Sequence, residues 1–444
     1  MRKFLLALCL LSSSFAFGLE RQSNADYRAR REALAKKLDG GVALILAAVE
    51  ADGPNAIYGF RQSDNFYYLT GVTEPGAAVL IAAAAEAKDD TPARSYREIL
   101  FLPNRDLVQE KWTGPKLGAD TSGVQQSTGF SEVSALSKLD EELPHFLARG
   151  IKVYTELPDA SNGTSPTALE WLRRTNALPG RIAVEDARRL LASLRTFKDA
   201  GEVALIRKAT DASAAAHRAA IGAMKAGMNE REISAVLQYE WDRRGCERPA
   251  YSPIVGSGFN STVLHYSADS ATIQAGDVVV IDAAGEYSMY ASDITRTLPA
   301  SGKFTPRQRE IYDIVLGAQQ AAIDAFQVGK SMIGPERGEN SLYKAAKDYI
   351  NTHGKDLHGK PLGDYFIHGL SHWVGLNVHD EGDYALPLSP GMVFTIEPGI
   401  YIPEEKLGVR IEDMFYVDAN GKLVRLSEGL PRTADEVEKA MAAK

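Results

Sequence analysis

Five acidic or imidazole side chains in the last third of the chain have the types and spacing of a metal site. They are Asp282, Asp293, His372, Glu397 and Glu412. Carboxylate oxygens bind hard divalent cations, and a single imidazole among them favours manganese, cobalt, iron or zinc over calcium. The sequence therefore predicts a centre for transition-metal ions.

Each pair of carboxylates flanks a short turn-like stretch. Asp282 and Asp293 flank an Ala-Gly-Glu-Tyr segment and have their midpoint between Tyr287 and Ser288, and Glu397 and Glu412 lie symmetrically about a Pro-Glu-Glu-Lys segment. Simple hairpins would place the two acids of each pair opposite each other on paired strands, where like charges destabilise a sheet. Two such pairs in one chain indicate a cation between them.

Three of the eight histidines lie within twelve residues, at His368, His372 and His379. Glycines between them disfavour a helix, and an alternating apolar pattern follows His372, so we expect a loop and then a strand. The segment lacks the His-Glu-x-x-His motif of zinc-peptidase helices. The neighbouring Ser371 lacks the Gly-x-Ser-x-Gly surroundings of a serine hydrolase.

The elements that must position these residues begin with alternating helices and strands. Such alternation is typical of an α/β layer domain, and we expect this domain to cover residues 19–192. The expected helices are 26–38, 137–147 and 167–174, and the expected strands are 42–46, 65–69, 77–81 and 98–102.

The chain changes character from Lys198, where a second domain over 193–444 is expected. An order of two helices, strands and a carboxylate hairpin occurs twice. We interpret it as an internal duplication whose two pseudo-symmetric halves each give one hairpin to a shared cleft. The expected helices are 198–224, 229–244, 305–328 and 341–352, with a strand at 251–255 and a glycine-rich loop at 256–258.

The first 18 residues are expected to be a secretory signal peptide and not part of the fold. A positive start and a short apolar run precede small residues, with cleavage predicted after Gly18. Lipidation of Cys9 is disfavoured because the bulky Leu8 precedes it. We therefore expect an exported protein, periplasmic or secreted.

Composition narrows the classes of function. The chain is 45% apolar and 24% charged, which is ordinary for a globular protein. Its formal net charge of −8 disfavours binding to nucleic acids or anionic membranes, and no apolar run reaches the roughly 18 residues of a membrane span. Cys246 is the only cysteine left after cleavage, so stability must come from the core and not from disulfides.

Several motifs carry a family resemblance over nearly the whole chain after residue 18. They lie at residues 368–373, 375–380, 397–401 and 408–413, at 255–260 with His265 beyond, and in the N-terminal half at 27–34, 60–71 and 74–75. In order and spacing they resemble the dinuclear metallopeptidases of family M24: methionine aminopeptidase, prolidase and aminopeptidase P (Xaa-Pro aminopeptidase). Aminopeptidase P resembles the chain most. The resemblance implies a pita-bread catalytic domain behind an aminopeptidase P-like N-terminal domain.

One departure from the family pattern stands in the N-terminal half. The family reads Arg-Gln-Asn-Ser-Asp-Phe, whereas this chain reads Arg-Gln-Ser-Asp-Asn-Phe from Arg61 to Phe66. The change concerns the contacts of the N-terminal domain with the substrate.

The resemblance also implies a role for each of the five metal-ligand candidates. Asp282 would bind one ion, Asp293 and Glu412 would bridge two, and His372 and Glu397 would complete the second site. The implied cofactors are two divalent ions, manganese first, with cobalt, iron or zinc as alternatives. A hydroxide shared by two ions would attack the scissile carbonyl, with Glu397 as the general base that hands the proton to the leaving proline nitrogen.

Four further side chains would act on the substrate or on a ligand. His368 and His379 would donate hydrogen bonds to the substrate and the tetrahedral intermediate. His265 would line the proline pocket, and Arg410 would clamp a ligand carboxylate from behind.

Three functions follow, and the sequence ranks them. The first is an exported aminopeptidase that releases the N-terminal residue from peptides with proline in second position. The second is a prolidase, which cleaves only Xaa-Pro dipeptides. The third is a metal-free pita-bread binding protein or a creatinase-like hydrolase, which the presence of all five ligand candidates opposes. The sequence is compatible with a homo-oligomer, either a dimer or a tetramer.

Overall fold

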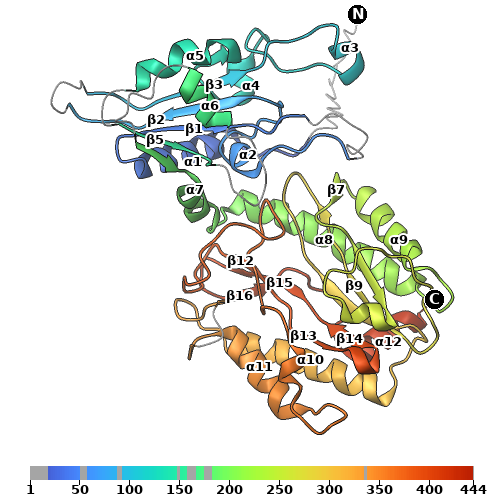
Figure 1. Cartoon of the computed structure of the whole chain (residues 1–444). Coiled ribbons are helices and arrows are strands. Elements are labelled where there is room, and N and C mark those ends of the chain that lie inside the picture. The colour runs from blue at the N-terminus through green and yellow to red at the C-terminus, as the bar shows by residue number, and fades with distance from the viewer. Residues whose placement is uncertain are drawn as a thin grey trace, which may run out of the picture.

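The computed structural model describes residues 19–50, 58–87, 93–147, 151–157, 167–174, 183–334 and 338–443. The predicted signal peptide, the first 18 residues, lies outside these ranges. Within them, an N-terminal domain sits on a larger C-terminal domain, and α7 and α8 connect the two (Figure 1).

The N-terminal domain is built on a six-stranded mixed sheet of order β4-β3-β2-β1-β5-β6. The central strands are continuous apolar runs because both faces are covered: Ala43 and Ile45 face one core cluster, and Val42 and Leu44 face another. The strands are β1 (Val42–Leu46), β2 (Ala78–Ala82), β3 (Arg97–Leu102), β4 (Val133–Ala135), β5 (Lys152–Thr155) and β6 (Ala183–Asp186).

Helices surround this sheet, and one of them replaces a predicted strand. The described helices are α1 (Asn24–Lys37), α2 (Asp64–Thr70), α3 (Glu110–Thr113), α4 (Val124–Thr128), α5 (Leu139–Glu142), α6 (Thr167–Arg174) and α7 (Arg188–Arg195). The expected helix over 137–147 is broken into α5 and two flanking 3₁₀ turns, η1 (Leu136–Lys138) and η2 (Leu143–Phe146).

The prediction of a strand at 65–69 is wrong, because this segment is helix α2. Its aromatic residues favour a strand by propensity alone. All residues from Asn65 to Thr70 are buried, which hides the helical period. Gly71 ends the helix in the left-handed conformation, with φ of 62°.

The C-terminal domain repeats one unit, as the sequence predicts. Helices α8 and α9 pack together on one side of the strands, and α10 and α11 pack together on the other (Figure 1). The helices are α8 (Ala200–Ala223), α9 (Glu230–Asp242), α10 (Pro306–Asp324), α11 (Leu342–His353) and α12 (Ala434–Ala442), with 3₁₀ turns η3 (Gly258–Thr262), η4 (Leu362–Tyr365) and η5 (Pro403–Glu405).

Short antiparallel strands fill the space between the helix pairs. One three-stranded sheet has the order β11-β9-β8 and the other β12-β15-β16, with two-stranded ribbons β10-β7 and β13-β14. The strands are β7 (Arg248–Pro249), β8 (Ile254–Ser257), β9 (Val278–Asp282), β10 (Gly285–Glu286), β11 (Thr295–Pro299), β12 (Val393–Ile396), β13 (Gly399–Ile402), β14 (Leu407–Arg410), β15 (Asp413–Val417) and β16 (Leu423–Arg425).

The register of the second hairpin agrees with the prediction from the sequence. Ile396 pairs with Asp413, and Gly399 pairs with Arg410. The same register carried across the intervening residues sets Glu397 against Glu412. The two acids therefore lie side by side.

The register of the first hairpin differs from the prediction. Asp282 pairs with Thr295 and not with Asp293. The turn is centred on Ser288 and Met289, whose φ angles are 50° and 73°. A tight hairpin turn needs positive φ at both central residues, and Ser-Met carries none of the Asn-Gly signal that would reveal one.

The predicted strand after His372 is also absent. Residues 374–380 have no regular structure, and the nearest pairing is the single bridge between Trp373 and Phe394. Val374 and Leu376 alternate because they pack into the core cluster shared with the N-terminal domain. The alternating apolar pattern thus reflects packing against the N-terminal domain and not a strand.

Candidate metal centre

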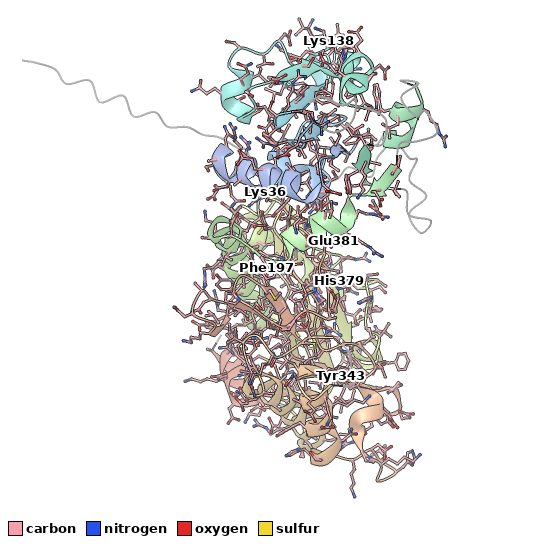
Figure 2. All side chains as sticks on the ribbon, turned by 90° about the vertical axis from the view of Figure 1, so that its left-hand side faces the viewer. Lys36, Lys138, Phe197, Tyr343, His379 and Glu381 are labelled. Atoms are coloured by element: carbon pink, nitrogen blue, oxygen red, sulfur yellow. The ribbon has the colours of Figure 1, made fainter. Side chains whose placement is uncertain are left out.

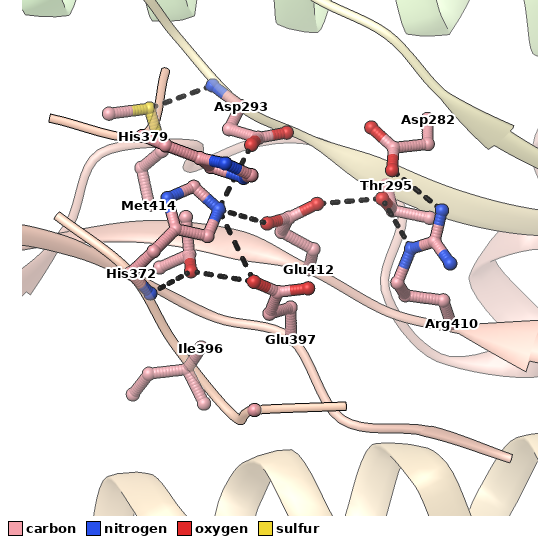
Figure 3. Close-up of polar contacts among 12 residues, drawn as sticks. Asp282, Asp293, Thr295, His372, His379, Ile396, Glu397, Arg410, Glu412 and Met414 are labelled. Atoms are coloured by element: carbon pink, nitrogen blue, oxygen red, sulfur yellow. Dashed lines mark hydrogen bonds and ion pairs between the residues drawn. The ribbon is translucent and has the colours of Figure 1, made fainter. Parts of the chain in front are cut away.

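Three of the five predicted metal ligands converge on an imidazole nitrogen of a fourth. His372 Nε2 lies 3.3 Å from Asp293 Oδ2, 3.3 Å from Glu397 Oε1 and 4.0 Å from Glu412 Oε1 (Figure 3). Ligand atoms of Asp293, His372 and Glu412 all fall within 4.8 Å of one another. These residues come from both halves of the domain, and a bridge between Thr295 and Glu412 joins the two hairpins.

Asp282, the fifth candidate, stands beside this group. The Tyr251 hydroxyl oxygen lies 2.6 Å from Oδ1 of Asp282 and 2.6 Å from Oδ1 of Asp293. Arg410 Nη2 donates to the other oxygen of Asp282 at 2.6 Å. All five candidates line one cavity of about 640 Å³, together with the predicted His265, His368, His379 and Arg410.

Asp282 is paired with Arg410, whereas burial and neighbouring acids disfavour ionisation of the other three carboxylates. Burial and the neighbouring Asp282 raise the pKa of Asp293 well above its usual range. Burial and Glu412 do the same to the pKa of Glu397, and burial with Asp293 to that of Glu412. Glu412 Oε1 is buried and accepts no hydrogen bond from the described residues.

This donor set fits divalent metal ions. Four carboxylates face one imidazole across a buried space, and a cation among them would offset the repulsion and use the unpaired oxygen of Glu412. Buried charges of one sign are retained only where they are paired or coordinate a metal. The residues present are therefore suited to the ions that the sequence predicts.

Neighbouring groups hold the ligands in place. Nδ1 of His372 faces the carbonyl of Trp373 at 3.2 Å, so it carries the proton and leaves the Nε2 lone pair directed at the acids. Thr295 Oγ1 donates to Glu412 Oε2 at 2.7 Å. Thr395 Oγ1 donates to Glu397 Oε1 at 3.2 Å. The ligand positions are thus fixed by hydrogen bonds from strands on both hairpins.

Two further histidines face the cavity in neutral form. His368 Nε2 lies 2.8 Å from the Tyr401 hydroxyl, and burial followed by the charge of Arg410 lowers its pKa to about 4. The His379 ring lies 4.3 Å from that of His372, and burial followed by His372 lowers the pKa of His379 to about 4. At neutral pH both imidazoles offer hydrogen-bonding groups without charge.

Arg410 is fully enclosed within the site. Besides Asp282, it donates from Nη1 to the Tyr401 hydroxyl at 2.8 Å and from Nε to Thr295 Oγ1 at 3.3 Å. It contacts the metal-ligand candidate Asp282 directly, and its role as a clamp stays a prediction. Its charge faces the carboxylate cluster from behind.

Sequence reasoning missed some participants. Tyr251, Thr295 and Thr395 all contact ligand candidates, yet hydroxyl side chains are common in strands and turns and gave no signal. Burial and the charges of Asp282 and Asp293 raise the pKa of Tyr251 well above its usual range, so its hydroxyl stays protonated. Only the fold brings it to the acids.

Comparisons with known proteins place the chain among peptidases. Residues 204–419 match metallopeptidase family M24, and residues 27–154 match the aminopeptidase P N-terminal domain. The chain is 35% identical to the Xaa-Pro aminopeptidase of Escherichia coli K12, over 95% of this chain and 98% of that protein. It is 32% identical to human Xaa-Pro aminopeptidase 3, over 86% of this chain and 76% of that one.

A solved structure shows the same architecture. Proline aminopeptidase P II from Yersinia pestis superposes with a TM-score of 0.82 at 32% identity, covering 95% of this chain and 100% of that one. This likeness confirms the expected fold class, an N-terminal domain followed by a pita-bread domain of two halves.

Proposed function

Since this chain belongs to the aminopeptidase P group of metallopeptidase family M24, we propose that it releases the N-terminal residue from peptides with proline in second position. The observation that carries the proposal is the convergence of Asp293, Glu397 and Glu412 on His372 Nε2 in one cavity. The relatives named Xaa-Pro aminopeptidase, which align over nearly the whole chain, support the choice of substrate.

The five ligand candidates would hold two divalent ions. Asp282 would serve one ion, Asp293 and Glu412 would bridge both, and His372 and Glu397 would serve the other. Manganese is the first choice, with cobalt, iron or zinc as alternatives. When bound, such ions polarise a carbonyl and lower the pKa of a water molecule.

The side chains of this protein would then move one proton. Glu397 would accept a proton from the attacking water and deliver it to the prolyl nitrogen as the C–N bond breaks. A prolyl amide has no N–H of its own, so the leaving nitrogen must receive that proton from the site. His379 would donate a hydrogen bond to the carbonyl oxygen as it gains charge. His368 would do so after its ring N–H leaves the Gly369 carbonyl, 2.7 Å from Nδ1, and His265 would line the proline side of the cavity.

A dipeptidase acting on Xaa-Pro is the second candidate, because it would use the same centre. The N-terminal domain matched over 27–154 and the names of the full-length relatives favour the aminopeptidase. A metal-free binding protein is disfavoured, because all five ligand positions keep their side chains.

We also propose that the first 18 residues direct export. Among the described residues, none of the helices has the length and apolarity to cross a bilayer. Fractionation of the native host followed by N-terminal sequencing would test this proposal. A cytoplasmic protein that keeps its first 18 residues would contradict it.

The decisive experiment compares substrates and metals on the purified protein. We expect cleavage of Xaa-Pro-Yaa tripeptides, loss of activity to chelators and recovery on adding Mn²⁺. Cleavage confined to Xaa-Pro dipeptides would establish the prolidase instead. Elemental analysis that finds no bound metal in an active preparation would refute the mechanism.

The role of Glu397 has its own test. Glu397→Gln keeps the size of the side chain but cannot accept the proton, so kcat should fall by about 10²–10⁴-fold or more. Circular dichroism should show an unchanged fold. A variant with more than about a tenth of the native kcat would exclude Glu397 as the base.

A further inference from the structure

A buried charge cluster lies directly beside His379. The carboxylate of the next residue, Asp380, accepts from Arg195 Nη2 at one oxygen and from Lys198 Nζ, at 2.9 Å, at the other. The side chains of Arg195, Lys198 and Asp380 are only 3%, 1% and 1% exposed. One carboxylate is therefore enclosed by two cations, in contrast to the metal centre nearby.

The cluster connects the two domains. Arg195, at the end of α7, also donates to Asn65 Oδ1 at 2.7 Å and lies 3.5 Å from Asp64 Oδ2, and both of these residues belong to α2. Figure 2 labels His379 where the domains meet, between Lys36 above and Tyr343 below. Asp64 and Asn65, two positions at which the chain departs from the family sequence, thus contact Arg195 at the start of the catalytic domain.

A second contact from the N-terminal domain reaches the same segment. Arg61 Nη2 donates to the carbonyl of Leu376 at 2.5 Å, and its Nε donates to Glu286 Oε2 at 2.8 Å. The stretch that carries His379 is therefore held from one side by α2 and its flanking residues, and from the other by Lys198 at the start of the catalytic domain.

His379 depends on this support because it has little of its own. Its segment has no regular secondary structure. Among the contacts of the described residues, its imidazole makes no hydrogen bond, and only its backbone N–H donates, to Asn377 Oδ1 at 3.1 Å. The following backbone N–H, of Asp380, donates to the Trp373 carbonyl at 2.9 Å. The ring position is thus set by the backbone.

Gly375 makes the close approach of Asp380 possible. A Cβ atom at this position would lie 2.1 Å from Asp380 Oδ2 and 2.9 Å from Lys198 Cε. Any larger residue would displace the carboxylate or the ammonium group. The loop is therefore built around the buried ion cluster.

We infer that Arg195, Lys198 and Asp380 are positioning residues, which hold the backbone of His379 so that its imidazole stays beside His372 in the cavity. The inference rests on the proposed function, in which His379 contacts the reacting peptide. Since a displacement of about 1 Å at a reacting group can cost roughly 100-fold in rate, the N-terminal domain contributes to turnover through Arg195.

Lys198→Met is the most informative variant. Asp380→Asn would leave two buried cations without a counter-charge, which is expected to destabilise the whole chain. Lys198→Met removes one cation and leaves Asp380 paired with Arg195, so the chain should still fold. The long apolar side chain of methionine also fills most of the space.

The control for Lys198→Met is a substitution in another buried ion pair, Arg31 with Glu98, which is distant from His379 in the sequence. Arg31 donates to Glu98 at 2.7 Å and 3.0 Å, and the two side chains are 0% and 4% exposed. Arg31→Met removes a buried cation within the N-terminal domain. It should cost as much stability as Lys198→Met or more, without a link to the cavity.

The kinetic test is a double-mutant cycle with a Xaa-Pro-Yaa peptide. We expect Lys198→Met to lower kcat by about 10–100-fold, with a change in KM below about threefold and unchanged metal content. In a His379→Ala background the same substitution should change kcat by less than about twofold. Equal losses in both backgrounds, or the same loss from Arg31→Met, would overturn the inference.

Hydrogen exchange gives a readout that needs no activity. Lys198→Met should speed amide exchange over residues 375–381 by about tenfold or more, and Arg31→Met should not. Unchanged exchange in this segment would overturn the inference. A native protein that cleaves no Xaa-Pro peptide would refute the proposed function, and the exchange result would still decide whether the cluster holds the segment.

Discussion

Glu412 and Asp413 are neighbours in the sequence, are equally buried, and have opposite electrostatic surroundings. Burial and the charges of Asp293 and Asp282 raise the pKa of Glu412. Burial opposes ionisation of Asp413 as well, but the Arg296 guanidinium, 2.7 Å away, holds the pKa of Asp413 below its usual range. Because successive side chains of a strand point to opposite faces, one acid faces the cavity and the other faces the core.

The contrast shows that burial alone does not separate structural from functional charges. Asp413 is satisfied by Arg296, by the Gln319 amide at 3.0 Å and by the Ser427 hydroxyl. Glu412 keeps an oxygen without a partner among the described residues. A satisfied acid stabilises the fold, whereas an unsatisfied one needs a ligand from outside. The neighbours His379 and Asp380 differ in the same way: Asp380 is paired with Arg195 and Lys198, whereas His379 lines the cavity.

The largest expected effect comes from neutralising the acid that faces the cavity. Glu412→Gln should reduce kcat/KM by at least about 10⁴-fold, or about 5 kcal/mol of barrier, because the proposed bridging ligand is lost. In the metal-free protein the same change removes repulsion from Asp293. Denaturant unfolding with chelator present should therefore show that the variant is at least as stable as the native protein.

The Glu412→Gln experiment is informative because activity should fall while the stability of the metal-free protein should not. A Glu412→Gln protein that unfolds more readily than the native one without metal would show that the carboxylate supports the fold. The contrast with Asp413 would then fail. Elemental analysis of both proteins checks that the lost activity follows the lost metal.

The next effect concerns the acid that faces the core. Asp413→Asn leaves the fully buried Arg296 without its counter-charge, so the free energy of unfolding should fall by about 3–5 kcal/mol. The folded fraction should lose far less activity than Glu412→Gln does. Urea denaturation and kcat/KM measured on one preparation test both statements.

The control for Asp413→Asn is the double variant Arg296→Met/Asp413→Leu. Replacing a buried ion pair by apolar side chains is often neutral or stabilising, but here it also takes a partner from the Pro431 carbonyl and the Gln319 amide. The double variant should therefore recover only the part of the loss that the unpaired charge of Arg296 causes. A fall of less than about 1 kcal/mol in the single variant would place Asp413 among exposed pairs and contradict its buried position.

The sequence was sufficient to select five candidates that line one cavity, but not to give their geometry. The pairing of Glu397 with Glu412 followed from the symmetry of a hairpin whose turn begins at Pro403. The same reasoning failed for Asp282 and Asp293, because Ser288 and Met289 adopt positive φ without any glycine or asparagine. Turn conformation set by tertiary contacts leaves no mark in a single sequence.

Other parts of the fold were hidden by burial. Helix α2 is enclosed on all sides, so its polar–apolar period disappears and its aromatic residues predict a strand. Tyr251 contacts two acids that follow it by 31 and 42 positions, a contact that depends on the sheet alone. Arg195 and Asp380, which are 185 positions apart, are brought together only when the domains pack.

The smallest expected effect concerns a third way to bury an ionisable group, which is to remove its charge. His217 lies behind the first hairpin, with its Nε2 2.9 Å from the carbonyl of Ala283, and burial lowers its pKa to about 4. In the unfolded chain its pKa is about 6.5. The folded state therefore favours neutral imidazole, and its contribution to stability is full above pH 6.5 and declines as the pH falls toward 4.

The shift corresponds to roughly 3 kcal/mol lost across that window. His217→Gln keeps an N–H that can reach Ala283 but cannot gain a proton, so its stability should fall less between pH 7 and pH 4. Urea unfolding at several pH values measures both slopes, and His353→Gln serves as the control for losing an imidazole that is exposed. Parallel curves for His217→Gln and the native protein would mean that His217 gains its proton as readily in the folded state as in the unfolded chain. Burial without a counter-charge would then not expel charge from this core, and the argument that the acids beside Glu412 require a cation would fail.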